Sequence, residues 1–290
     1  MDLQNIRAFI QWISLIGSNS YLGFLKTKQV YQGALKSSCV PFLNCHSCPS
    51  ALFSCPIGTI QHFMTIHKFP YLVSGYLAAV GISVGALPCG WLCPFGLIQD
   101  LLYKINSVKI KIHEKLTVLR YYSLIFLVIF FPLMTQETWF SKICPMGTIQ
   151  AAIPWVVWNP VIPVYGEPAV SLKTLGFLFI AKILIAFSFI GLFIISKRPF
   201  CRLICPLGAI LGLFNRVSLL RLGVNTKDCK DCQKCRDICP VDINISDDPQ
   251  ASTCVRCFKC LHCENVKISL GKRSKKEEIA TEAEELSRVK

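Results

Sequence analysis

Long apolar runs, separated by short basic or cysteine-containing segments, dominate the first 224 residues. A transmembrane helix needs about 20 mostly apolar residues. Three stretches meet this requirement: Tyr71–Pro88, Tyr121–Thr135 with its flanks, and Leu175–Ser196. A fourth, Ile6–Leu25, is interrupted by Arg7 and Gln11; we predict that it also spans, the alternative being an amphipathic helix lying in the interface. The pattern predicts a membrane α-helical bundle of about four transmembrane helices.

Hydrophobicity falls and cysteine density rises after Val224. We therefore divide the chain into a transmembrane domain (residues 1–224), a soluble cysteine-rich domain (225–270) and a polar tail (271–290), to which we assign no chemistry.

Basic residues orient this bundle. They cluster in two segments that we expect to face the cytoplasm: Lys104, Lys109, Lys111, Lys115 and Arg120 in the first, and Lys197, Arg198, Arg202, Arg216 and Arg221 in the second. Residues 26–70 and 141–173 then lie on the outer side, although Lys26, Lys28, Lys36 and Lys68 argue against exporting the first of these loops. We predict a multi-pass protein of the cell inner (cytoplasmic) membrane with the soluble domain in the cytoplasm.

Composition supports a membrane protein that binds metal. The chain is 52% hydrophobic and only 17% charged, which excludes an ordinary soluble domain of 290 residues. Its net charge of +14 suits cytoplasmic loops, anionic lipid or an acidic partner equally well. We expect the membrane and redox subunits, not nucleic acid, as partners. The 17 cysteines are an odd number in a long apolar chain, which excludes a small secreted disulfide scaffold.

The soluble domain carries the most specific motif. Cys229, Cys232, Cys235 and Cys239 follow C-x2-C-x2-C-x3-C-P, and Cys254, Cys257, Cys260 and Cys263 form a slightly shortened second copy. This is the bacterial-type ferredoxin pattern for two 4Fe-4S clusters, in which the fourth cysteine of each run serves the other cluster. The expected sets are Cys229, Cys232, Cys235 and Cys263, and Cys254, Cys257, Cys260 and Cys239. The alternative is a pair of zinc sites.

A second motif, C-P-x-G, occurs four times, beginning at Cys55, Cys93, Cys144 and Cys205. Proline favours the first turn of a helix, so each cysteine should cap a short helix, whose N-terminus lowers the pKa of a thiol. The copies divide the membrane part into two pseudo-repeated parallel halves. Each inner copy has a partner cysteine four residues earlier, so we predict one 4Fe-4S cluster between the halves, held by Cys89, Cys93, Cys201 and Cys205.

Four cysteines on the predicted outer side define a further candidate site. Cys45, Cys48 and Cys55 come from the first loop and Cys144 from the third, while Cys39 is left over. We predict a second membrane-embedded 4Fe-4S cluster; the alternative is disulfide bonding or free buried thiols.

The remaining polar residues give weaker indications of function than the cysteine motifs. The three strongest spans hold no histidine, which argues against haem, and no dinucleotide or phosphate-loop motif is present. Lys182 inside the last span should face the bundle or a cavity. We expect His46, His62, His67 and His262 to be surface or interface residues. Gln99, Asp100 and Gln150 are the candidate contacts for a quinone.

The motifs Cys89-Gly-Trp-Leu-Cys93-Pro and Cys201-Arg-Leu-Ile-Cys205-Pro, followed by both ferredoxin runs, resemble the NapH/MauN ferredoxin-type membrane proteins and their NosR-type relatives. The resemblance implies a four-span subunit with a cytoplasmic double-cluster ferredoxin domain, which in the nitrate reductase system oxidises quinol and passes electrons to a periplasmic partner. Cys45, Cys48, Cys55 and Cys144 depart from the typical pattern.

The predicted function is electron transfer by a membrane-integral polyferredoxin subunit, between the cytoplasmic ferredoxin domain, the embedded clusters, and a quinone or an extracytoplasmic redox partner. The alternatives are a quinol dehydrogenase subunit of the periplasmic nitrate reductase type, and a reductase for metalloprotein maturation. In each case a partner subunit of an oxidoreductase complex is expected.

Overall fold

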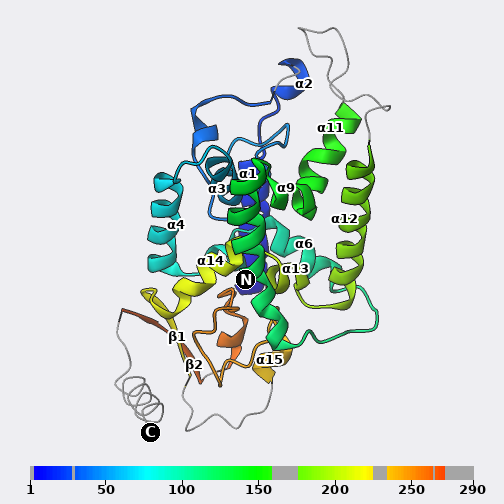
Figure 1. Cartoon of the computed structure of the whole chain (residues 1–290). Coiled ribbons are helices and arrows are strands. Elements are labelled where there is room, and N and C mark those ends of the chain that lie inside the picture. The colour runs from blue at the N-terminus through cyan, green and yellow to red at the C-terminus, as the bar shows by residue number, and fades with distance from the viewer. Residues whose placement is uncertain (1–2, 28–29, 159–175, 225–233, 264, 272–290) are drawn as a thin grey trace.

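The computed structural model describes residues 3–27, 30–158, 176–224, 234–263 and 265–271. Four long helical stretches run roughly side by side (Figure 1): α1 (Leu3–Ser18), α4 (Tyr71–Val84), a continuous helix over residues 114–135, and α12 (Phe177–Ile195). The third of these is built from η2 (Glu114–Val118), α7 (Leu119–Tyr122), the π-helical η3 (Ser123–Phe130) and α8 (Phe131–Thr135). Within the described residues, the helix over 114–135 and α12 are the two that are long and apolar enough to cross a membrane.

The other two predicted spans, Tyr71–Pro88 and Ile6–Leu25, are longer than the helices in the structure. Helix α4 has 14 residues and ends at Gly85, which adopts a φ of 58° that favours glycine. The chain then enters the short α5 (Leu87–Trp91), with Pro88 in its first turn. Helix α1 has 16 residues and ends at Ser18, where the side chain of Asn19 donates to the carbonyl of Leu15. The predicted bundle of about four full-length spans is therefore not established by helix length.

Burial in α1 is the reverse of that in a water-soluble helix. Its polar residues Arg7, Gln11 and Ser18 are buried, whereas Phe9 and Ile16 are 58% and 65% exposed. The Gln11 amide donates to the backbone carbonyls of residues 90 and 93. The two longer helices are also mostly unburied, with 22% and 17% of their apolar windows inside the protein. An apolar outer face of this kind suits lipid and not water.

Short helices fill the two ends of this arrangement. Towards the upper end in Figure 1 lie α2 (Phe24–Thr27), η1 (Ala34–Ser37), α3 (Pro56–Thr65), α9 (Trp139–Ile143), and the continuous helix formed by α10 (Pro145–Gly147), the π-helical η4 (Thr148–Ala152) and α11 (Ile153–Trp158). Lower down lie α6 (Pro94–Leu102), α13 (Pro199–Leu203) and α14 (Pro206–Leu213). Phe95 of α6 packs edge-on against Phe193 and Phe200, which joins α6 to α12 and α13.

The C-terminal domain lies at the lower end and begins after η6 (Phe214–Arg216). It contains an antiparallel pair of strands, β1 (Leu220–Val224) and β2 (Val266–Leu270), with α15 (Lys234–Ile238) and η7 (Lys259–His262). Two glycines permit its close approach to the helices: a Cβ on Gly90 or Gly212 would lie 2.3 Å or 2.1 Å from the carbonyl oxygens of Val255 and Ser252. The indole N–H of Trp91 also donates to the Arg256 carbonyl.

Candidate iron-sulfur sites

All four C-P-x-G motifs fold in the same way. Each cysteine occupies the N-cap position in an extended conformation, and the following proline begins the helix: α3, α6, α10 and α14. The backbone N–H of the motif glycine stabilises the thiolate of each cysteine; these glycines are Gly58, Gly96, Gly147 and Gly208. At Cys205 it donates a hydrogen bond of 3.3 Å from Gly208 to the sulfur. The prediction that each motif starts a helix is confirmed, and the repeated glycine proves to be part of the site.

The helix N-terminus does not ionise these thiols by itself, contrary to the expectation of a lowered pKa. Burial raises the pKa of the Cys144 thiol to about 12, although the N–H of Gly147 acts in the opposite direction. Burial likewise raises the pKa of Cys45 to about 12. A coordinated metal must therefore supply the remaining stabilisation of a thiolate at these positions.

The structure brings together the four cysteines predicted for the inner site. Cys89 of α5, Cys93, Cys201 of α13 and Cys205 line one cavity of about 20 Å³. The thiol of Cys205 interacts electrostatically with those of the other three. Two of the four thiols come from each half of the repeat, as the duplication predicts.

Positive charge surrounds the inner site. The buried guanidinium of Arg120 lines its cavity and donates to Ser252 Oγ at 2.8 Å. Arg198 donates to both carboxylate oxygens of Asp100 at 2.7 Å, and its charge reaches Cys89 and Cys201. Burial opposes ionisation of Asp100, but Arg198 and then Arg7 outweigh it and lower the pKa of this carboxyl to about 2.

The ligands expected for one C-terminal cluster also meet. Cys239, Cys254, Cys257 and Cys260 line a cavity of about 20 Å³, together with Cys235. The Cys254 thiol interacts electrostatically with Cys257, Cys239 and Cys260. Cys229 and Cys232, from the other predicted set, lie outside the described residues, so that set stays a prediction.

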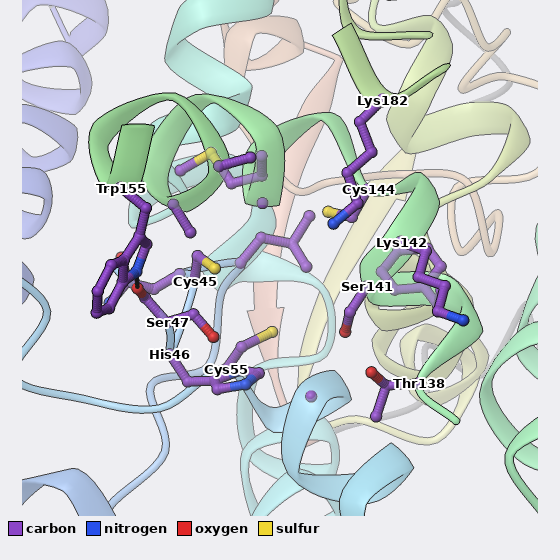
Figure 2. A pocket seen from close by; sticks show the side chains of 18 residues that line it. Cys45, His46, Ser47, Cys55, Thr138, Ser141, Lys142, Cys144, Trp155 and Lys182 are labelled. Atoms are coloured by element: carbon purple, nitrogen blue, oxygen red, sulfur yellow. Dashed lines mark hydrogen bonds between the residues drawn. The ribbon is translucent and has the colours of Figure 1, made fainter. Parts of the chain in front are cut away.

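The outer site is a larger cavity of about 330 Å³ (Figure 2). Cys45, Cys55 and Cys144 line it, and the charge of the Cys144 thiol reaches both of the others. Cys48 is buried nearby, with its sulfur 3.2 Å from Ser50 Oγ, but it is not part of the lining. Lys182 lines this cavity, as expected for a lysine inside an apolar helix.

The three residues predicted to contact a quinone have other partners. The amide of Gln99 donates to Cys201 Sγ at 3.2 Å, and Asp100 binds Arg7 and Arg198. Gln150 accepts the backbone N–H of Cys45 at 2.7 Å. These residues support the cysteine sites, so the structure lends no support to a quinone at them.

The predicted histidine roles agree with the structure for the exposed His62, His67 and His262. His46 is instead half-buried and lines the outer cavity.

The described residues fit an anionic iron-sulfur cluster better than a single ion. No group of three or more His, Cys, Asp or Glu side chains among them is placed to hold one metal ion. A cubane carries its thiolates on separate corners, so its ligands stand further apart. In the same part of the chain five arginines are buried: Arg7, Arg120, Arg198, Arg202 and Arg256. Only two carboxylates are comparably buried there, Asp242 and Asp100, whose side chain is 15% exposed. Such an excess of buried positive charge is costly unless an anion compensates it.

Comparison with known proteins agrees with this chemistry. A family model described as a 4Fe-4S binding domain matches the chain twice, over residues 66–113 and 178–225, once in each half. MauN of Methylorubrum extorquens, a methylamine utilization ferredoxin-type protein, is 26% identical over 65% of this chain and 58% of its own. The chain is similar to ferredoxin-type proteins such as MauN. The resemblance noted from the motifs is therefore confirmed.

Two further relatives extend the comparison. An uncharacterised protein of Methanocaldococcus jannaschii is 28% identical over 71% of this chain and 81% of its own length. YccM of Escherichia coli, whose name assigns it to electron transport, is 26% identical over 69% of this chain and 53% of its own. No solved structure matches the chain. The family supports iron-sulfur electron transfer as the coarse function.

Proposed function

We propose that this protein is a membrane-integral electron-transfer subunit that carries four 4Fe-4S clusters. Two belong to residues 225–270, one is held between the halves by Cys89, Cys93, Cys201 and Cys205, and one lies in the outer cavity. Each cluster, when bound, accepts and releases one electron. The chain's own residues position the clusters, exclude water and surround them with positive charge.

The continuity of the three described sites carries this proposal. The inner cavity shares Cys254 and Val255 with the C-terminal cavity, and Leu43 with the outer cavity. Leu43 is 3% exposed, and its backbone N–H donates to the thiol of Cys93. It stands two residues before Cys45. A short path of covalent and hydrogen bonds therefore joins a ligand of the outer site to a ligand of the inner site.

The position of the sites within the helices supports transfer across a membrane. The C-terminal domain packs at one end of the long helices, and α3 and α11 lie towards the other (Figure 1). The exposed apolar face of α1 and the largely unburied α12 fit a lipid environment. A hydrocarbon core of about 30 Å would then be crossed through successive sites. In this arrangement the C-terminal domain is cytoplasmic.

A second candidate, the quinol dehydrogenase subunit, is favoured by one observation. A cavity of about 660 Å³ adjoins the outer cavity and shares His46, Gly58 and Thr138 with it. Apolar and aromatic side chains, including the exposed Phe69 and Tyr71, line it. Such walls suit the ring of a quinone. Quinone retained by the purified protein, and quinol-dependent reduction of its clusters, would favour this candidate. No structural observation favours the maturation reductase, since Cys39 lines neither cavity.

The decisive experiment is an iron and sulfide count with EPR on anaerobically purified protein. Four cubanes correspond to about sixteen iron atoms. Cys93→Ala should remove about four of them and leave the C-terminal signals in place, because the inner site alone loses a ligand. Cys39→Ala serves as the matched control and should keep all of them. Unchanged iron in Cys93→Ala would contradict the shared inner site.

The orientation needs a separate test. Reporter fusions after Arg221 and after Lys173 should report opposite sides of the membrane. Lys173 itself lies outside the described residues. The same side for both fusions would contradict the proposed topology.

A further inference from the structure

The outer cavity differs in size from the other two cysteine sites. It encloses about 330 Å³, whereas the inner and C-terminal cavities each enclose about 20 Å³. The outer site therefore has room for a small molecule beside its thiols, which the other two cavities lack.

Only three of the four thiols predicted for this site face the cavity. Cys45, Cys55 and Cys144 line it, and Figure 2 shows them on the cavity wall. The sulfur of Cys48 lies 3.2 Å from Ser50 Oγ and is not on the cavity wall, although its charge reaches Cys45. The thiol of Cys45 in turn interacts electrostatically with Cys55 and Cys144. Three thiols on the wall are one fewer than the four that a cubane with only cysteine ligands requires.

The remaining wall of the cavity is positively charged. Lys142 and Lys182 line it, and no Asp or Glu belongs to the described lining. Lys142 forms an ion pair with Glu137. Lys182 has no ion pair or hydrogen bond to any residue in the described part of the chain. A lysine in an apolar helix such as α12 is costly and is typical of a functional site.

Figure 2 shows the side chain of Lys182 entering the cavity beside Cys144. We propose that the outer site is a ligand-binding iron-sulfur site, a conclusion that rests on the proposed function. Cys45, Cys55 and Cys144 hold three corners of the cluster, and the fourth corner takes a small anion from the cavity. The ammonium group of Lys182 attracts that anion. On this proposal Cys48 is a buried structural residue and not the cluster ligand that the sequence predicts.

Matched cysteine variants test the ligand set. Cys144→Ala and Cys45→Ala should each remove the outer EPR signal together with about four iron atoms. Cys48→Ala should keep both the signal and the iron. Loss of the outer signal in Cys48→Ala, with Cys93→Ala still removing the inner cluster, would overturn this inference and leave the proposed function intact. Iron content that is unchanged in Cys144→Ala would overturn both.

Cyanide, a small anion that binds iron, tests the open corner. Its addition to the reduced holoprotein should change the outer EPR signal and leave the inner and C-terminal signals unchanged. Lys182→Met should raise the Kd for cyanide about tenfold or more, whereas Lys182→Arg should preserve it. Lys109→Met, which removes a lysine outside the outer-cavity lining, is the charge-matched control and should have no effect. An outer signal insensitive to cyanide, or an unchanged Kd in Lys182→Met, would overturn the inference.

Discussion

The side-chain amide of Gln99 donates a hydrogen bond of 3.2 Å to the sulfur of Cys201, which lies in the other half of the repeat. Gln99 stands six residues after Cys93, and glutamines stand at the same distance after Cys55 and Cys144. These two glutamines also bond across the halves. Gln150 accepts the N–H of Cys45, and Gln61 donates to the carbonyl of Leu127. These three glutamines therefore link the halves, and Gln99 and Gln150 bond directly to a cysteine.

Gln99→Leu should lower the reduction potential of the inner cluster. A donor to a ligating sulfur stabilises the more negative, reduced state, and its loss should shift the potential down by roughly 20–60 mV, since about 59 mV is tenfold for one electron. Stability should change little, because Leu keeps most of the volume and Gln99 Oε1 has no partner. An EPR-monitored redox titration measures the shift. Gln150→Leu is the control, and an equal fall of the inner potential in that variant would contradict the assignment.

Asp100→Asn should destabilise the protein strongly. It leaves the buried guanidinium of Arg198 and the nearby Arg7 without their carboxylate, a loss of about 3–5 kcal/mol for a buried pair. The folded-state pKa of Asp100 is lowered to about 2, so its contribution is present above about pH 4 and is lost as the pH falls through about 2. The penalty should therefore be constant between about pH 6 and pH 8.

The measurement for Asp100→Asn is the unfolding midpoint in mild detergent at both pH values. Glu137→Gln is the matched control, because the Lys142–Glu137 pair is exposed and should contribute less than about 1 kcal/mol. Equal penalties in the two variants would show that burial of the Asp100 pair has no energetic role.

Arg120→Met should act in opposite directions with and without iron. The guanidinium lines the inner cavity, so its removal should lower the potential of the bound cluster. After the iron is removed, the same guanidinium is a buried charge without an anion, and Arg120→Met should then be more stable than the parent protein. Redox titration and thermal unfolding of the iron-depleted protein measure the two effects. Arg216→Met, at a 73% exposed side chain, should change neither.

Local sequence signals predicted the short helices that begin at the cysteine motifs. Proline fixes the first turn of a helix through its own backbone geometry, so the four C-P-x-G motifs could be recognised without tertiary information. The duplication then indicated which thiols meet at the inner site. The lengths of the spans were harder to predict, because Gly85 ends α4 at a position where hydrophobicity continues.

Contacts between distant segments could not be predicted from the sequence. The charge pattern predicts cytoplasmic loop positions for Arg120, Arg198 and Arg202, yet all three are buried. A positive charge in the sequence does not distinguish an arginine of an exposed loop from an arginine that lies beside an iron-sulfur site. The repeated motif glycines and glutamines were visible as a pattern, but the hydrogen bonds of the glutamines depend on how the halves pack. Nothing in the local sequence marks Leu43, which acquires its place only when the first loop folds between two sites.

Leu43→Pro should disturb the connection between the outer and inner sites. Proline has no backbone N–H, so the bond to Cys93 is lost, while the apolar contact is largely kept. The inner potential should fall by roughly 20–60 mV, as for the loss of any such donor, and electron transfer from the inner to the outer cluster should slow. Leu43→Ala keeps the N–H and should leave the inner potential unchanged. Redox titration gives the potential, rapid-freeze EPR gives the rate, and an iron count shows that both variants bind their clusters. If Leu43→Ala lowers the potential as much as Leu43→Pro does, the side chain and not the hydrogen bond controls the inner site.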